Sequence, residues 1–113
     1  MSYTIFHNPN CTTSRNVLAM IREAGHEPEV VQYLKTGWTK AQLNSLLKAM
    51  GKTPRDILRT KEKLAAELGL ADAPGGKILD AMVEHPVLVE RPIVVAPKGT
   101  ILARPKELVA PLL

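Results

Sequence analysis

The chain has 113 residues, a length that suits one domain. Hydrophobic residues make up 45% of it and charged residues 23%, the balance of a globular protein rather than a disordered tail. Its 15 lysines and arginines exceed its 11 acidic residues only slightly, and aromatic residues make up 4%. Because nucleic-acid-binding surfaces combine strong positive charge with aromatic stacking, we expect no nucleic-acid partner.

The most distinctive feature of the composition is a single cysteine, Cys11. One cysteine excludes an intrachain disulfide, and with three dispersed histidines it predicts no zinc site or other metal centre. No stretch approaches the roughly 18 apolar residues of a membrane span, and the first residues lack a signal-peptide pattern. We therefore expect no membrane partner and a cytoplasmic location, where thiols stay reduced. Cys11 is then either an inert thiol or one reactive thiol.

The first third of the chain predicts a strand, a turn, a helix and a second strand. Residues 3–6 are β-branched and aromatic, and the turn cluster 7–10 follows them. Apolar residues then recur at helical spacing from about residue 12 until Gly25. Residues 29–33 read as the second strand. Such a unit predicts two parallel neighbouring strands joined by a right-handed crossover.

The middle of the chain predicts three helices. The first ends at Gly51 and begins with a capping box, in which Thr39 is the N-cap and Gln42 follows three residues later. The second has Thr53 as its cap and Pro54 at its first position. The predicted spans are 39–50, 53–68 and 76–85.

The end of the chain predicts a hairpin and a last helix. Apolar segments 93–96 and 100–103 flank the turn 97–99, which indicates two antiparallel strands, and residues 105–112 follow as a helix. The order βαβ, several helices, ββα predicts an α/β protein with a thioredoxin-like fold and a helical insertion between its two halves. We expect a single domain over residues 1–113, with the insertion at about 39–85.

Cys11 falls between the first strand and the first helix. A helix N-terminus presents unpaired N–H groups and partial positive charge, which favour a thiolate. The residues around Cys11 are polar, so a reactive thiol is favoured over an inert one. Ser14 occupies the position at which a Cys-x-x-Cys motif would have its second cysteine. Any disulfide made by Cys11 must therefore be resolved by another molecule.

Two arginines precede prolines at the ends of predicted strands, in Arg91-Pro92 and Arg104-Pro105. Both ends lie on the side of the predicted sheet that is expected to meet Cys11. A cis proline at Pro92 would be typical of a thioredoxin-like domain.

Taken together, these residues resemble the arsenate reductase family that couples to glutathione and glutaredoxin. The resemblance covers essentially the whole chain and rests on residues 3–16, 55–59, 85–86 and 90–94 and on the hairpin that ends in Arg104-Pro105. It implies that Cys11 is the catalytic nucleophile. The same resemblance assigns oxyanion binding to Arg59, Arg91 and Arg104, and thiolate stabilisation to His7, Ser14 and Arg15.

The resemblance also implies a function. The protein would reduce arsenate to arsenite through Cys11, with glutathione as co-substrate, glutaredoxin as partner and no tightly bound cofactor, acting as a monomer. Two alternatives stay open. One is an Spx-like regulatory protein that binds RNA polymerase, although such proteins usually carry the Cys-x-x-Cys switch that Ser14 interrupts. The other is a monothiol glutaredoxin-like protein that handles thiol–disulfide exchange.

Overall fold

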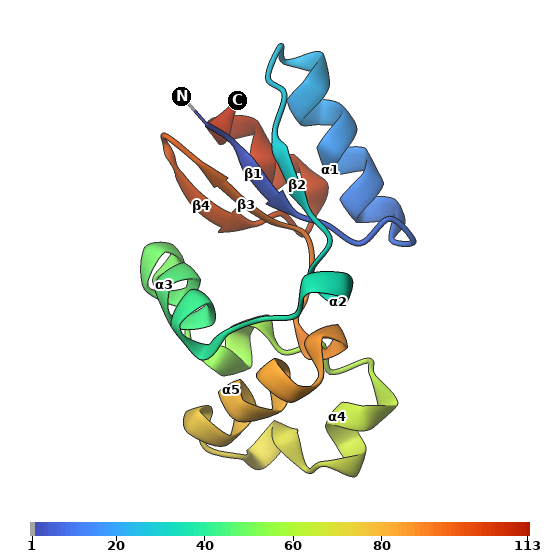
Figure 1. Ribbon diagram of the computed structural model, residues 1–113, viewed down its shortest axis with the longest axis vertical. Helices are drawn as coiled ribbons and strands as arrows, with labels where there is room; N and C mark the ends of the chain where they lie inside the picture. The colour runs from blue at the N-terminus through green and yellow to red at the C-terminus, as the bar shows by residue number, and fades with distance from the viewer. Residues whose placement is uncertain (1) are drawn as a thin grey trace. The chain divides into compact units, whose positions relative to one another are not determined.

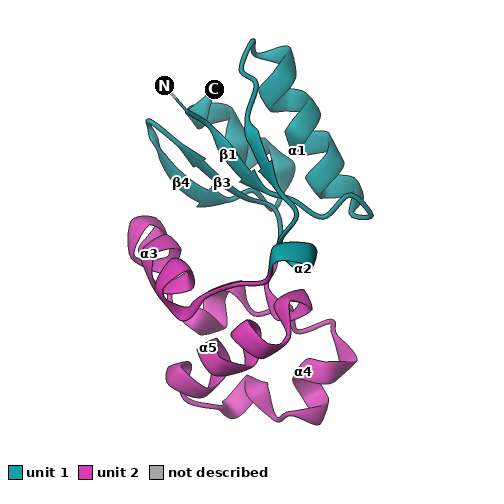
Figure 2. Cartoon of the chain, viewed as in Figure 1, with its two compact units in different colours: residues 1–36, 91–113 teal, residues 37–90 magenta. Residues whose placement is uncertain are grey.

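The computed structural model describes residues 2–113, which divide into two compact units. One unit consists of the chain up to residue 36 together with residues 91–113, and the other of residues 37–90 (Figure 2). The predicted helical insertion at about 39–85 lies within the second unit. Whether the whole chain behaves as a single domain stays a prediction.

The first unit is built on a four-stranded sheet with strand order β2-β1-β3-β4 (Figure 1). The strands are β1 (Thr4–Phe6), β2 (Glu29–Val31), β3 (Ile93–Ala96) and β4 (Gly99–Leu102). β1 and β2 are parallel, as the strand–helix–strand pattern predicted, and β3 pairs antiparallel with both β1 and β4. The predicted C-terminal hairpin is thereby confirmed. The mixed sheet with its flanking helices is a thioredoxin-like α/β fold.

Two helices cover one face of this sheet (Figure 1). They are α1 (Thr12–Glu23) and the C-terminal 3₁₀ helix η4 (Lys106–Leu112). Their buried residues form one core with residues in the strands or next to them; its members are Tyr3, Ile5, Val17, Ile21, Val94, Ala103, Val109 and Leu112. Helical spacing brings the α1 members to one side of the helix, and the period of two does the same in β1. The Tyr3 hydroxyl adds a buried hydrogen bond to the Leu112 carbonyl at 2.9 Å.

The strand register places one end of each of β1, β3 and β4 side by side, at the same end of the sheet. Phe6, the last residue of β1, pairs with Ile93, the first of β3, and Ile93 pairs with Leu102, the last of β4. The segments beyond these three residues therefore start side by side. They carry Cys11, Arg91 and Arg104, which are the residues that the sequence predicted to meet.

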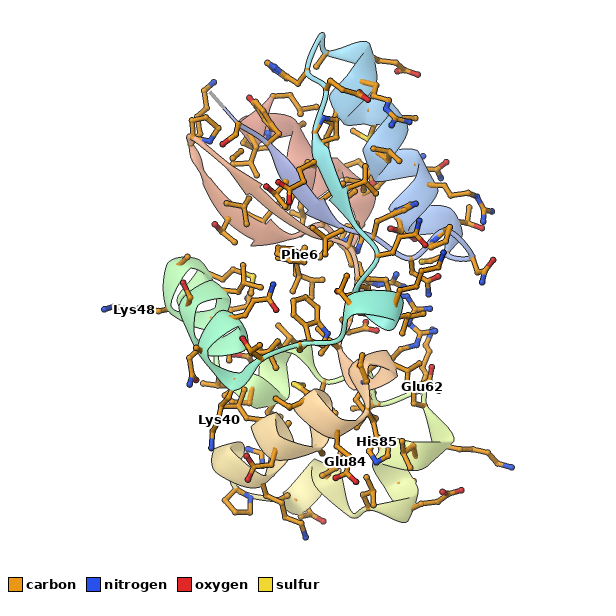
Figure 3. All side chains as sticks on the ribbon, in the orientation of Figure 1. Phe6, Lys40, Lys48, Glu62, Glu84 and His85 are labelled. Atoms are coloured by element: carbon orange, nitrogen blue, oxygen red, sulfur yellow. The ribbon has the colours of Figure 1, made fainter. Side chains whose placement is uncertain are left out.

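The second unit is helical. It contains α3 (Lys40–Met50), η1 (Pro54–Ile57), α4 (Lys63–Glu67), η2 (Leu70–Asp72), α5 (Gly75–Glu84) and η3 (Pro86–Leu88). Helix α5 contacts α3, η1 and η3, and its buried residues Ile78, Leu79, Ala81 and Met82 supply much of this unit's core. The predicted capping box is present, because the Gln42 N–H donates to the Thr39 hydroxyl and the Gln42 side chain accepts from the Thr39 N–H. Lys40 at the start of α3, labelled in Figure 3, pairs with Asp80 of α5 at 3.1 Å.

The prediction of one continuous helix over 53–68 is wrong. The chain forms η1, leaves helical geometry at Leu58, and becomes helical again only at Lys63. The cause is long-range pairing: Leu58 forms a β-bridge with Val89, and the Arg59 N–H donates to the Leu88 carbonyl at 2.7 Å. Periodicity within the segment carries no sign of a partner 30 residues away.

Two smaller predictions also need correction. The second strand was expected to reach Tyr33, but it ends at Val31, and Tyr33–Thr36 form the short helix α2. The Gln32 carbonyl accepts hydrogen bonds from residues 35 and 36, which closes this turn. The last helix has 3₁₀ rather than α geometry; it contains Pro111, which has no N–H for an α-helical hydrogen bond. Within residues 2–113, no helix combines the length and the apolar character needed to cross a membrane.

Candidate active site

Cys11 is the N-cap of α1, as the sequence predicted. Its backbone is extended, with φ −99° and ψ 121°, and its carbonyl accepts the first helical hydrogen bond, from the Arg15 N–H at 3.0 Å. Its own N–H donates to the Asn8 carbonyl at 3.0 Å, which closes the preceding turn. The Cys11 side chain is only partly exposed. This geometry leaves the sulfur at the positive end of the helix.

Arg104 lies beside the sulfur of Cys11. Its Nη1 lies 3.7 Å from Cys11 Sγ and also donates to the Arg91 carbonyl at 3.1 Å. One guanidinium nitrogen therefore connects the segment after β4 with the segment before β3 and with the thiol. The peptide bonds Arg91-Pro92 and Arg104-Pro105 are both cis.

Arg91 is buried, with 9% of its surface exposed. Among the described residues, its Nε and Nη1 atoms have no hydrogen-bond partner. Buried polar groups in proteins are nearly always satisfied, and a buried charge without partners is costly. A guanidinium with open N–H donors suits the oxygens of a tetrahedral oxyanion, which can accept two of them at once. Arg91 therefore has unused capacity for an anion beside Cys11.

These neighbours control the ionisation of Cys11. Burial raises the pKa of the thiol, but the Ser14 backbone N–H and the Arg91 and Arg104 guanidinium groups outweigh it. The pKa of Cys11 is consequently lowered from its ordinary value. Because the thiolate is the nucleophilic form of cysteine, the site favours the reactive form of its thiol.

His7 and Ser14 form a buried pair behind this thiol. His7 Nδ1 lies 2.6 Å from Ser14 Oγ, and the Asn8 N–H donates to the same oxygen at 3.1 Å. Burial lowers the pKa of His7, and the charges of Arg22 and Arg15 lower it further. Ser14 thus contacts the thiol through its backbone N–H and contacts His7 through its hydroxyl.

Arg15, a predicted thiolate-stabilising residue, is directed to the loop before the helix. Its Nη1 donates to the Pro9 carbonyl at 2.8 Å and its Nη2 to the Thr12 hydroxyl at 3.2 Å. The positions of these bonds indicate that Arg15 holds the ends of the cysteine loop together. Its effect on the thiolate stays a prediction.

Arg59, the third predicted oxyanion-binding arginine, belongs to the second unit and has carboxylate partners. Its Nε lies 3.2 Å from a Glu62 oxygen, and its Nη1 lies 3.0 Å from a Glu90 oxygen (Figure 3 labels Glu62). Burial lowers the pKa of Arg59, but Glu90 and Glu62 outweigh it and raise that pKa. Arg59 is therefore firmly charged and already paired, and its predicted role toward an oxyanion remains to be tested.

Three supporting residues escaped the sequence analysis. Asn8 holds the cysteine loop through its carbonyl, its N–H and its side-chain oxygen, which accepts from the Asn10 N–H at 3.0 Å. The Asn-Pro-Asn turn signal hinted at this role. Glu62 lies three residues after Arg59, a spacing that predicts an ion pair on a helix. Glu90 has no local signal, because it meets Arg59 only through the β-bridge between residues 58 and 89.

Fold and site together define a class of protein: a thioredoxin-like domain with one activated thiol at a helix N-terminus and two arginines beside it. Within residues 2–113 no group of three or more His, Cys, Asp or Glu side chains is arranged to hold a metal ion. A sequence model of the ArsC family matches residues 6–111. The chain belongs to the ArsC family.

Relatives and solved structures agree with this assignment. Arsenate reductase ArsI2 of Synechocystis is 55% identical over 96% of this chain and 79% of its own length. The arsenate reductase of Escherichia coli K12 is 46% identical over 97% of this chain and 79% of its own. The solved structure of an arsenate reductase from Vibrio cholerae superposes with a TM-score of 0.94 at 39% identity, covering 100% of this chain and 98% of that one.

Proposed function

We propose that this protein reduces arsenate to arsenite, with Cys11 as nucleophile, glutathione as co-substrate and glutaredoxin as the protein that regenerates the thiol. The observation that carries the proposal is the buried Arg91, whose Nε and Nη1 have no hydrogen-bond partner among residues 2–113 and which lies beside a thiol with a lowered pKa. A tetrahedral oxyanion would satisfy those donors. The relatives named arsenate reductase, up to 55% identical, support arsenate as that oxyanion.

In the first step the Cys11 thiolate attacks arsenic, and an S–As bond forms. An As–O bond breaks, and the departing oxygen leaves as water after taking up a proton. Arsenic remains As(V) at this stage. Arg91 and Arg104 stabilise the negative charge on the remaining oxygens, because they are in place before the charge develops and need little reorganisation.

In the second step the thiolate of glutathione attacks the sulfur of Cys11. An S–S bond forms, the S–As bond breaks, and its electron pair stays on arsenic. Two thiol sulfurs are oxidised to a mixed disulfide while As(V) is reduced to As(III), so the two electrons balance. The arsenite that leaves takes up the proton lost by glutathione.

The mixed disulfide on Cys11 then needs an outside thiol. Cys11 is the chain's only cysteine, so no resolving thiol comes from within. A glutaredoxin thiolate can attack the glutathione sulfur, which releases Cys11 as a thiolate. Its lowered pKa makes Cys11 a good leaving group in this exchange.

The test is arsenate-dependent oxidation of NADPH, coupled through glutathione, glutaredoxin and glutathione reductase. We expect turnover that needs all components and that disappears in Cys11→Ser. Replacement of glutathione and glutaredoxin by thioredoxin and thioredoxin reductase separates the two reductant systems. Undiminished turnover with thioredoxin alone would refute the glutathione coupling while leaving arsenate reduction intact.

A second assay addresses the monothiol alternative. A glutathionylated model peptide serves as substrate in place of arsenate. Efficient deglutathionylation by the wild-type protein, together with no arsenate-dependent turnover, would replace arsenate reduction by glutaredoxin-like exchange. We expect the reverse pattern, because Arg91 has two nitrogens without hydrogen-bond partners among residues 2–113, and a tetrahedral oxyanion bound at the sulfur can accept from both.

A further inference from the structure

Arg15 is an exposed arginine that the fold holds beside the loop of the thiol. Its backbone N–H bonds to the Cys11 carbonyl at 3.0 Å, one helical turn earlier. Its guanidinium donates to the Pro9 carbonyl at 2.8 Å and to the Thr12 hydroxyl at 3.2 Å. The side chain is therefore bonded to the chain on both sides of Cys11, which orders its charge next to the nucleophile of the proposed reaction.

The charge of Arg15 is not neutralised by a carboxylate within residues 2–113. Both side-chain acceptors are neutral oxygens, and Arg15 forms no ion pair with any of these residues. A guanidinium has five N–H donors, and the two bonds use two of them. Because the side chain is exposed, the remaining donors are available to an acceptor from solution.

The other arginines assigned to the site are engaged elsewhere. Arg59 pairs with two carboxylates. Arg91 and Arg104 act on the thiol, and the oxygens of the proposed arsenic adduct occupy them once that adduct has formed. A co-substrate that brings further negative charge to Cys11 then needs compensating charge from another group, and Arg15 can supply it.

Glutathione, the proposed co-substrate, has two carboxylates and one ammonium group. The ammonium and the γ-glutamyl carboxylate share one carbon atom, so their charges compensate each other. The glycine carboxylate is the charge that has no such neighbour within the molecule. Carboxylates suit guanidinium groups, because the two form forked, charge-assisted hydrogen bonds.

We propose that Arg15 binds the glycine carboxylate of glutathione and thereby directs the glutathione thiolate to the sulfur of Cys11. In this step an S–S bond forms between the two thiol sulfurs, the S–As bond breaks, and its electron pair stays on arsenic. Arg15 is then a specificity residue for the thiol, whereas Arg91 and Arg104 bind the oxyanion. This inference deepens the proposed function and rests on its glutathione coupling.

The test replaces the arsenic adduct by a disulfide on Cys11, so it needs no arsenate. Cys11, the chain's only cysteine, is converted to its neutral 2-thiopyridyl disulfide. The glutathione thiolate attacks the Cys11 sulfur, the new S–S bond forms, and pyridine-2-thiolate leaves and takes up a proton. The rate is measured with glutathione and with its glycine ethyl ester, and mass spectrometry identifies glutathionylated Cys11.

The measured quantity is the rate with glutathione divided by the rate with the ester. We expect this ratio to be roughly two- to fivefold higher in wild type than in Arg15→Gln, the range that an exposed ion pair contributes. Because each ratio is taken within one protein, altered loop geometry or leaving-group reactivity cancels. Arg15→Lys keeps the charge and should keep most of the preference, and added salt should reduce it.

Arg22→Gln is the matched control, because Arg22 is an exposed arginine of the same helix that already pairs with Glu27 at 3.1 Å. Its ratio should equal that of wild type. Equal ratios in wild type and Arg15→Gln would overturn the proposal. So would an equal drop in Arg22→Gln, which would reveal a general effect of positive charge.

The coupled arsenate assay gives a second measurement. Arg15→Gln should raise the KM for glutathione and leave the KM for arsenate unchanged. A raised KM for arsenate alone would contradict the assignment of Arg15 to the thiol. If glutathione supports no arsenate turnover in wild type, the proposed function fails, and the ratio of the two thiol rates still decides whether Arg15 binds the carboxylate.

Discussion

Two of the three predicted oxyanion-binding arginines differ in the partners of their guanidinium groups. Arg59, in the helical unit, lies between the carboxylates of Glu62 and Glu90. Arg91, beside the sheet, is more deeply buried yet keeps two guanidinium nitrogens without partners among the described residues. Protein carboxylates already balance the charge of Arg59, whereas no carboxylate within residues 2–113 forms an ion pair with Arg91. An incoming anion would therefore form more new hydrogen bonds with Arg91 than with Arg59.

The burial of Arg91 is costly for the fold. A charged group removed from water without full compensation destabilises the native state, and sites that bind anions accept this cost. The contrast suggests that Arg59 serves mainly the stability of its unit and Arg91 mainly the chemistry at Cys11. Five sets of measurements test or refine that difference.

Arg91→Met should have the largest effect. Loss of one preorganised donor costs about 2.7–4 kcal/mol of transition-state stabilisation in oxyanion sites, so kcat should fall roughly 10²–10³-fold. Its free energy of unfolding should stay within about 1 kcal/mol of wild type or rise, because a poorly compensated buried charge is replaced by an apolar chain. Coupled turnover and urea unfolding measure the two quantities. A large loss of stability would contradict the assignment of Arg91 to chemistry.

The pH dependence of Cys11 alkylation should also distinguish Arg91 from Arg59. The folded pKa of this thiol is lowered, so alkylation of the native protein should reach half its maximal rate at a lower pH than alkylation of the urea-unfolded chain. Arg91→Met should move that midpoint up, whereas Arg59→Ala should not.

Stability is linked to the same titration. Between the lowered folded pKa and the unfolded pKa, the unfolded chain binds a proton that the native chain does not. The wild-type stability should therefore rise with pH across this window, relative to Cys11→Ser, and be level above it. Urea unfolding at several pH values measures the difference. A difference that falls as pH rises would contradict the lowered pKa.

Arg59→Ala should affect stability more than Arg91→Met does. It leaves Glu90 without its arginine partner in a partly buried position, which should cost about 1–2 kcal/mol of unfolding free energy. Its loss of kcat should be smaller than that of Arg91→Met. Equal losses of kcat in the two variants would show that Arg59 also reaches the oxyanion, and the contrast between the two arginines would then fail.

Glu62→Gln should have the smallest effect. The pair with Arg59 lies in the turn between η1 and α4, its carboxylate is about one-third exposed, and exposed pairs contribute roughly 0.2–1 kcal/mol. The difference should shrink as salt is added. Denaturant unfolding at low and high salt checks it, with Glu90 intact as the remaining partner of Arg59. A loss above about 1 kcal/mol would mean that Glu62 matters as much as Glu90.

Many secondary-structure elements of this protein could be predicted from residues that are close together in the sequence. The strand before Cys11, the helix after it, the Thr39 capping box and the C-terminal hairpin all depend on residues a few positions apart. Periodicity, caps and turn residues act over that range, so these elements were predicted correctly. The lone cysteine also determined that any disulfide at Cys11 must be resolved from outside the chain.

Which side chains pair with one another was decided by the tertiary structure. Arg104 meets Cys11 across 93 positions of sequence, and Glu90 meets Arg59 across 31. The break of the predicted helix at Leu58 has the same origin, a bridge to Val89. Which charges are neutralised and which stay open depends on burial and on chain segments brought together only by folding. The sequence identifies the arginines as candidates. Only the folded structure distinguishes Arg59, which is paired with carboxylates, from Arg91, because electrostatic energy depends on distance and on exclusion of water.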